Sequence, residues 1–252
     1  MIQKFFILLV LAVILYLPTL RAPFTFDDEA VIVHNPLLWH LSDGLSGVQD
    51  VWNFQRSRFI TNLTIALNFQ FQQLHTTSYH LINLLIHLLA VGGVWYLTKL
   101  ILEAKRIKNL KIDLSFYTAL LFLVHPLHTE SISYIAQRSS ALVGMFYVWS
   151  VCFYIKGRVS TVASKSMQQF ILSALFALLA LLSKETALSL PLALILVDHF
   201  VLNKKYPKLL WIAMFGAFLL VISFFDFQFK EILFKPVFSQ SHKYDYLTLK
   251  TY

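Results

Sequence analysis

The sequence predicts an all-α membrane protein, a polytopic helical bundle with about seven transmembrane helices. Two observations predict this fold class. Of the 252 residues, 58% are hydrophobic and only 13% are charged, whereas a soluble domain carries about 25% charged residues. The hydrophobic residues are also collected into long runs that short polar loops separate. Such runs are typical of helices that cross a membrane.

The apolar runs predict where the helices lie. We expect them at residues 4–20, 79–101, 114–126, 139–155, 168–183, 186–202 and 209–225. A full crossing needs about 20 residues. The third, fourth and fifth runs are short, so some of these helices are expected to stop part-way or to lie obliquely.

The domain organisation follows from these runs. Residues 1–225 are expected to form one transmembrane module, and 226–252 an outer segment. The chain ends at Tyr252 without an evident cap or tail. The outer segment can therefore also be interpreted as the start of a further C-terminal part.

Positive charge predicts the orientation. The basic residues gather in three loops, at 105–111, 156–165 and 204–208. Basic loops favour the cytoplasmic side, so the N-terminus is expected to be cytoplasmic and residues 21–78 form an outer loop. That loop is expected to hold short amphipathic helices in the membrane interface. The net charge of +8 does not indicate a nucleic-acid partner, because it is distributed over these loops.

An acidic turn opens the outer loop, with Asp27, Asp28 and Glu29 in sequence. Carboxylates beside a bilayer are costly unless water, a cation or a reaction requires them. The turn is therefore either a solvated loop, or the start of an interfacial helix, or a general base or cation site at the mouth of the bundle. The residues alone leave these alternatives open.

Two further stretches on the expected outer face carry cations. Arg58, close to Arg56, either reaches lipid headgroups or grips a phosphate with its guanidinium fork. Lys184 and Glu185 stand in a short turn between two apolar runs. They are either simply solvated or placed to meet an anionic lipid carrier.

Polar residues also lie inside the second apolar run. His80, Asn83 and His87 are spaced at i, i+3 and i+7, so they share one face of a helix. Such a face usually points into the bundle. Hydrogen bonding between helices is the simplest role for it.

A proline interrupts the chain at the outer end of the third apolar run, at Pro126. A helix that restarts there would align three polar residues along one slanted stripe, namely Glu130, Tyr134 and Arg138. His125, His128 and Glu130 could ligate a metal, but a hydrogen-bonding network facing the acidic turn is the favoured interpretation.

Four stretches, in this order, resemble a known family. They are Phe26-Asp27-Asp28 followed by Asn35-Pro36; Arg58 with Thr61 and then Tyr79 to His87; His125 to Glu130 with Arg138; and Ser183-Lys184-Glu185. The ordered set resembles the GT-C glycosyltransferases. It is most similar to the branch of transmembrane proteins with C-terminal tetratricopeptide repeats, which are protein O-mannosyltransferases and their bacterial relatives.

The resemblance implies a GT-C-like fold and an enzyme that moves a sugar from a polyprenyl-phosphate-linked donor, with inversion, to an acceptor hydroxyl. The acceptor would be a protein serine or threonine, or a glycan. Asp27 and Asp28 are assigned as the catalytic residues, and by similarity Asp27 is preferred as the base. The active site would face the periplasm or another extracytoplasmic space, and the protein would sit in a membrane such as the bacterial inner membrane.

The remaining site residues are assigned from their chemistry. Arg58, Arg138 and Lys184 are candidates for holding the donor phosphate, and the substrate pocket is assigned to His80, His125, His128, Glu130 and Glu185. No residue is assigned as a metal ligand, no cofactor is certain beyond the lipid-linked sugar, and a divalent metal stays open. Membrane lipids, the donor and the acceptor are the expected partners. A proton- or cation-coupled transporter or lipid-handling protein, and a non-catalytic subunit of a membrane assembly, are the alternatives.

Overall fold

A computed structural model describes residues 2–108, 110–204 and 219 of the chain. The chain divides into two units, residues 1–205 and 206–252, and the fold below is that of the first. The predicted helix at 209–225 and the predicted outer segment 226–252 lie outside the described residues, except for Leu219. Every regular element among the described residues is helical, which confirms the predicted all-α class.

The first unit contains nine α-helices within its described residues. In chain order they are α1 (Ile2–Tyr16), α2 (Leu45–Phe54), α3 (Phe59–Gln72), α4 (Thr76–Ala104), α5 (Leu114–Val124), α6 (His128–Ser133), α7 (Arg138–Val159), α8 (Ala163–Leu181) and α9 (Leu190–Leu196). Short 3₁₀ or π turns extend several of them. The turn at Leu17–Arg21 extends α1, Ile135–Gln137 precedes α7, and Glu185–Ser189 and Val197–Leu202 flank α9.

Five of the described segments are long and apolar enough to cross a membrane. They are Gln3–Arg21, Thr76–Ala104, Ile135–Val159, Ala163–Leu181 and Glu185–Leu202. All five coincide with predicted runs, so a polytopic membrane protein is confirmed, although a total of seven crossings is not. The third run forms only the 11-residue helix α5, which spans roughly 16 Å of a hydrocarbon layer about 30 Å thick.

The helix lengths correct part of the prediction. As expected, α5 is short, because Pro126 follows it and holds His125 in an extended conformation. The fourth and fifth helices are longer than predicted, at 22 and 19 residues. The fourth continues past its predicted end, to Val159, because Lys156 and Arg158 stand in its last turn, where cations favour the C-terminal end of a helix. The fifth begins with polar residues that extend the helix beyond its apolar part.

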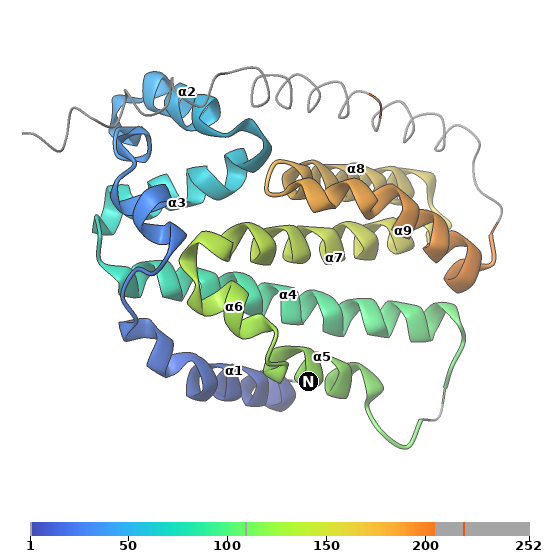
Figure 1. The fold of residues 1–252 in the computed structure, drawn as a ribbon. Helices are drawn as coiled ribbons and strands as arrows, with labels where there is room; N and C mark the ends of the chain where they lie inside the picture. The colour runs from blue at the N-terminus through green and yellow to red at the C-terminus, as the bar shows by residue number, and fades with distance from the viewer. Residues whose placement is uncertain (1, 109, 205–218, 220–252) are drawn as a thin grey trace, which may run out of the picture. The chain divides into compact units, whose positions relative to one another are not determined.

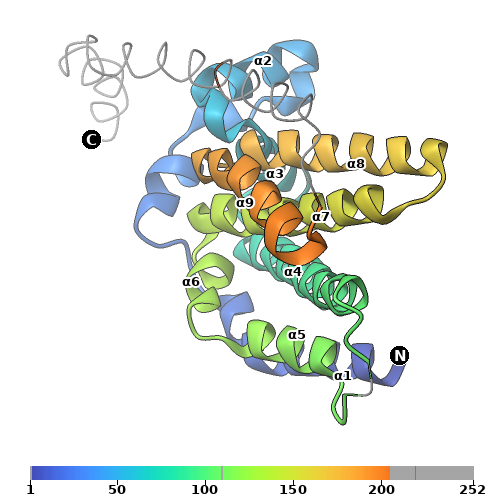
Figure 2. The same cartoon turned by 90° about the vertical axis from the view of Figure 1, so that its right-hand side faces the viewer.

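The long helices pack side by side. In Figures 1 and 2, α4 lies between α7 on one side and α1 and α5 on the other, and α8 covers α7. Small residues allow the close approach that helices in membranes use for packing. A Cβ added to Gly93 of α4 would come within 2.9 Å of Val148 of α7. Between α7 and α8, the hydroxyl of Ser150 donates to the backbone oxygen of Ser173 at 2.9 Å.

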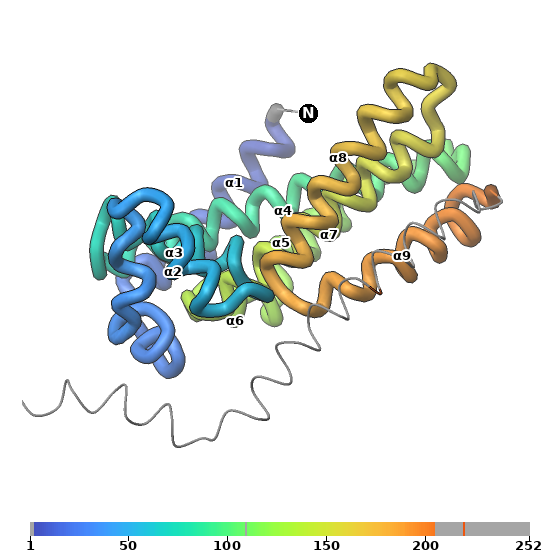
Figure 3. The backbone as a smooth tube through the Cα atoms, turned by 90° about the horizontal axis from the view of Figure 1, so that it is seen from above, coloured from blue at the N-terminus to red at the C-terminus, as the bar shows by residue number. Residues whose placement is uncertain are grey.

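The loop between α1 and α4 has its own core. Figure 3 shows α2, α3 and α6 gathered at one end of the long helices, far from the turn between α7 and α8. Buried apolar residues join α2 and α3 to the turn that precedes α7, among them Ile32, Val51, Ile65 and Ile135. The prediction of short helices in residues 21–78 is therefore confirmed by α2 and α3. Because this core includes Ile135, it fixes the loop against the start of α7.

A buried ion pair closes the other end of the bundle. Asp198, which is 1% exposed, accepts hydrogen bonds from Arg158 Nε at 2.8 Å and from the Tyr154 hydroxyl at 2.6 Å. It lies just after α9, whereas Tyr154 and Arg158 belong to α7. The pair therefore ties the end of α9 to α7.

Replacement of Asp198 by alanine is expected to lower the free energy of unfolding by about 3–5 kcal/mol, because it removes the buried carboxylate that accepts from both Arg158 and Tyr154. Thermal unfolding of the purified protein measures the loss. Glu103→Ala is the matched control, since the Glu103–Lys99 pair is exposed and 3.9 Å apart, and such pairs add little stability. Equal melting temperatures for the two variants would contradict the role assigned to Asp198.

Candidate active site

The two aspartates of the acidic turn differ in burial. Asp28 is fully buried, whereas Asp27 is exposed. One oxygen of Asp28 accepts the backbone N–H of Ala136 at 2.7 Å, and the other accepts that of Thr25 at 3.1 Å. Both oxygens of Asp28 are therefore used to hold the turn against the start of α7. The Asp27 carboxylate is left facing solvent.

The electrostatic setting of Asp28 agrees with a structural role. Burial raises the pKa of its carboxyl group, while the backbone hydrogen bonds and the nearby His80 act in the opposite direction. The raised pKa shows that burial outweighs these favourable contacts. A carboxylate enclosed in this way has no free oxygen to offer a substrate.

Tyr134 holds the exposed half of the turn. Its hydroxyl accepts the backbone N–H of Asp27 at 3.1 Å. Partial burial raises the pKa of Tyr134, while the backbone hydrogen bond from Asp27 lowers it. A side-chain hydrogen bond with Asp27 and the charges of Asp27 and Asp28 raise it further. Phe26, 86% exposed, has the left-handed φ of 50° and packs its ring edge against that of Tyr134. A non-glycine residue in this region is strained, and such strain is often found at functional sites.

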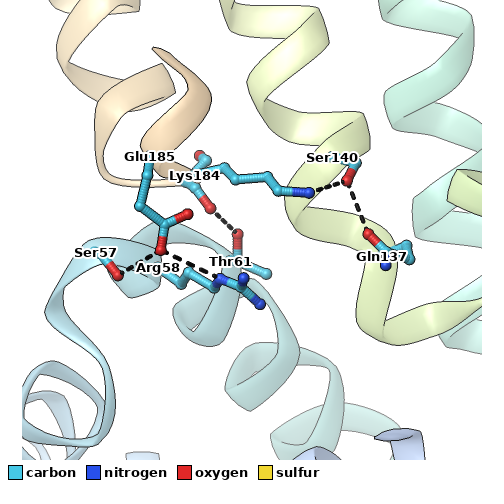
Figure 4. Close-up of polar contacts among 8 residues, drawn as sticks. Ser57, Arg58, Thr61, Gln137, Ser140, Lys184 and Glu185 are labelled. Atoms are coloured by element: carbon cyan, nitrogen blue, oxygen red, sulfur yellow. Dashed lines mark hydrogen bonds and ion pairs between the residues drawn. The ribbon is translucent and has the colours of Figure 1, made fainter. Parts of the chain in front are cut away.

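Two cations, Lys184 and Arg58, lie at the turn between α8 and α9. Lys184 is followed there by Glu185. The backbone of Lys184 is extended, with φ −164° and ψ 146°, so the two side chains point in opposite directions. Figure 4 shows Lys184 reaching Ser140 of α7 and Glu185 reaching the segment that precedes α3. The adjacent pair is thus not simply solvated, because each member contacts a different element.

Lys184 forms no ion pair with a described carboxylate that would balance its charge, whereas Arg58 lies beside Glu185. Its Nζ donates to the Ser140 hydroxyl at 2.6 Å, and that hydroxyl donates to Gln137 Oε1 at 2.8 Å. Within the described part of the chain, Lys184 has no carboxylate partner. Because an ammonium has three donors, two remain for an anion.

Arg58 is held beside this turn by Glu185. Its Nε lies 3.9 Å from Glu185 Oε1, and the same oxygen accepts the hydroxyl of Ser57 at 3.2 Å. The guanidinium makes no hydrogen bond to another described residue, so its Nη donors are available. Two bonds anchor this corner, from Thr61 Oγ1 to the oxygen of Ser183 at 3.0 Å and from Ile60 N to the oxygen of Leu182 at 2.9 Å.

Arg138, a candidate for holding the donor phosphate, lies inside the helix bundle. It is fully buried and donates to Asn83 Oδ1 and Asn68 Oδ1, both at 2.7 Å, and to the Tyr79 oxygen at 3.1 Å. A fourth bond reaches Thr64. A guanidinium enclosed by these partners positions the surrounding helices, and we do not retain it among the groups that meet a phosphate.

The predicted stripe of Glu130, Tyr134 and Arg138 is wrong. Helix α6 ends at Ser133, and Tyr134 is extended, with φ −94° and ψ 110°. Glu130 is exposed, whereas Arg138 points into the bundle. The two residues therefore do not share one helix face.

The inward face of α4 is confirmed. His80 and Asn83 are fully buried, and His87 is 4% exposed. Asn83 accepts from Arg138 and donates to the oxygen of Ile132 at 3.3 Å. His80 lies 3.2 Å from the oxygen of Ala22. His80, which was assigned to the substrate pocket, is therefore buried behind the acidic turn and does not line an open pocket.

The histidines after α5 form a separate group. The ring of His128 lies 5.0 Å from that of His87 and 6.0 Å from that of the exposed His125. Burial, and then the neighbouring His125, lower the pKa of His128. Among the described residues, no group of three or more His, Cys, Asp or Glu side chains could hold a metal ion.

The segment from Tyr134 to Ser140 connects the two parts of the site. Tyr134 and Ala136 contact the acidic turn, and Gln137 and Ser140 form the hydrogen-bond chain to Lys184. Asp27 and the cations Arg58 and Lys184 therefore belong to one end of the bundle. Sequence reasoning did not assign Ser140 or Gln137 to the site, although their position beside Arg138 at the start of an apolar run was a usable signal.

Comparison with known proteins gives relatives of one kind. No family model matches this chain, and no solved structure does. A protein O-mannosyl-transferase of Caenorhabditis elegans is 31% identical over 167 residues, which are 62% of this chain and 24% of that protein. Protein O-mannosyl-transferase tmtc2 of Xenopus laevis is 30% identical over 204 residues, 77% of this chain and 24% of that protein.

A human relative shows the same similarity. Protein O-mannosyl-transferase TMTC3 of Homo sapiens is 32% identical over 155 residues, 57% of this chain and 16% of that protein. The chain thus spans between 16% and 24% of the length of these three curated relatives. The resemblance predicted from the four motifs is confirmed, since over most of its length this chain is similar in sequence to the protein O-mannosyl-transferases.

Proposed function

We propose that this chain is part of a membrane glycosyltransferase that moves a sugar from a polyprenyl-phosphate-linked donor to a hydroxyl group of a protein. The reaction takes place on the side of the membrane away from the basic loops. Relatives named as protein O-mannosyl-transferases support a sugar donor and a protein acceptor. The lipid-phosphate donor and the sidedness rest on the residues of the site and on the charge of the loops.

The observation that carries the proposal is that residues 134–140 contact both the acidic turn and Lys184. One side of this segment positions a solvent-facing carboxylate, Asp27, and the other positions a cation, Lys184, that has no carboxylate partner. Transfer from a phosphate carrier requires both a base for the acceptor and a positive charge for the leaving group.

The chemical step assigns a role to each group. Asp27 takes the proton of the acceptor hydroxyl as its oxygen forms a bond to the anomeric carbon. The bond between that carbon and the phosphate oxygen breaks, and its electron pair stays on the phosphate. Lys184 and Arg58 hold the charge that develops there. Attack from the face opposite the phosphate inverts the anomeric centre.

Asp28 and Arg138 act at a distance from the reacting atoms. Asp28 fixes the turn that presents Asp27, because its two oxygens bind backbone N–H groups on both sides of the contact. Arg138 joins α7 to the helices α3 and α4. Both are positioning residues in this mechanism.

The test of the proposal is a donor panel. Membranes that contain the chain are incubated with a series of polyprenyl-phosphate monosaccharides and a serine- or threonine-containing peptide. Release of the lipid phosphate and mass gain of the peptide are measured together. We expect both to occur with one donor, and proton-coupled uptake into vesicles without any transfer would overturn the proposal.

Replacement of Lys184 by glutamine is expected to lower the transfer rate by roughly 10²–10³-fold, the usual loss when one group that stabilises developing charge is removed. The rate of phosphate release at saturating donor measures this effect. Lys111→Gln is the matched control, because Lys111 is an exposed loop lysine outside the site. A variant at Lys184 with the wild-type rate would remove this residue from the mechanism.

A further inference from the structure

A hollow lies at the end of the bundle opposite the candidate active site. It is formed by the end of α4, the end of α7 and the start of α8, and has a volume of about 550 Å³. In Figure 1 these helix ends lie away from α2, α3 and α6, so the hollow is remote from the candidate active site. Its polar lining includes Tyr96, Glu103, Lys156, Ser160, Lys165 and Gln169.

The two lysines of this pocket lack counter-charges. Among the described residues, neither Lys156 nor Lys165 forms an ion pair with a carboxylate. Lys156 Nζ instead lies 5.7 Å from the centre of the Tyr96 ring, a contact that holds the ammonium at the wall. Glu103, the one acid in the lining, lies 3.9 Å from Lys99. The lining is therefore positive on balance.

Gln169 adds an unused polar group. Its Oε1 is buried and has no hydrogen-bond partner among the described residues. A half-turn of the amide exchanges this oxygen for the NH₂ donor. An acceptor oxygen of a ligand in the pocket could then accept a hydrogen bond from the Gln169 amide.

Apolar side chains complete the lining. Leu100 of α4 and the 52% exposed Val159 of α7 belong to it. The pocket thus combines ammonium and amide donors with an apolar edge. It lies where α4 and α7 end and α8 begins. Basic pockets between membrane helices at such a level are suited to the phosphate of a lipid headgroup.

We propose that this pocket binds a phosphate-bearing anion, held by Lys156 and Lys165. The ligand is either an acidic phospholipid at the membrane surface or a soluble phosphate. The apolar edge and the size of the pocket, which exceeds what inorganic phosphate alone would fill, favour the lipid. The site is independent of the proposed transfer reaction.

The test compares two double variants of the full chain, purified with phosphatidylcholine and then titrated with phosphatidylglycerol. Lys156→Gln with Lys165→Gln is expected to retain roughly twenty-five-fold less phosphatidylglycerol, on about a fivefold loss for each lysine removed. Lys108→Gln with Lys111→Gln removes the same charge from exposed residues outside the pocket, and it should retain the lipid as the wild type does.

Further arms identify the ligand and exclude misfolding. Lys156→Arg with Lys165→Arg should restore binding, because the positive charge returns. Protection of the wild type against thermal unfolding by inorganic phosphate, lost in the glutamine variant, would support the site with a soluble phosphate as its ligand. Equal lipid retention by the wild type and the pocket variant, or equal loss in both glutamine variants, would overturn the proposal.

Discussion

Replacement of Asp27 by asparagine is expected to lower sugar transfer by about 10²–10⁴-fold, which is the usual contribution of a general base. The fold should be nearly unchanged, because the Asp27 side chain is exposed and asparagine keeps both the backbone N–H that Tyr134 accepts and a side-chain oxygen for the Tyr134 hydroxyl. Phosphate release from the donor measures transfer, and the melting temperature reports on the fold.

Two neighbouring acids serve as controls for this result. Glu29→Gln removes an exposed carboxylate from the same turn and should leave transfer nearly intact. Asp28→Asn should instead lower the melting temperature, since an amide can accept only one of the two N–H groups that Asp28 binds. Normal transfer by the Asp27 variant would refute its assignment as the base.

Replacement of Arg138 by alanine is expected to lower the free energy of unfolding by about 3–5 kcal/mol. The variant would leave the buried side-chain oxygens of Asn68 and Asn83 without the donors that Arg138 supplies. Denaturation in detergent measures the loss. Arg21→Ala, which removes an exposed arginine, is the control and should change stability little.

The lysine variant separates the two roles that Arg138 has been given. Arg138→Lys keeps the charge but cannot reproduce the fork that binds two asparagines and a backbone oxygen. If Arg138 positions helices, this variant will lose stability. If Arg138 held the donor phosphate instead, the variant would lose transfer with its melting temperature unchanged, and our placement would be wrong.

Local patterns predicted the features that depend on neighbouring residues. The spacing of His80, Asn83 and His87 is enough to place them on one inward face, because a helix repeats every 3.6 residues. The end of α5 follows from Pro126 in the same way. The polytopic all-α class follows from composition alone.

Features that depend on distant partners could not be predicted. The burial of Arg138 requires Asn68 from α3 and Asn83 from α4, and no pattern around Arg138 reveals them. The break at Tyr134 has no proline or glycine to signal it. Likewise, spacing alone did not distinguish Asp27 from Asp28, whereas the backbone N–H groups of Thr25 and Ala136 do.

The segment from Tyr134 to Ser140 has a mechanical consequence. Its seven residues can extend no further than about 25 Å, and their ends hold the acidic turn and the lysine of the α8–α9 turn through single hydrogen bonds. The separation between base and cation is thus limited by a short covalent segment as well as by the core that packs the loop against Ile135. A one-residue insertion between Tyr134 and Ser140 would therefore change this separation directly.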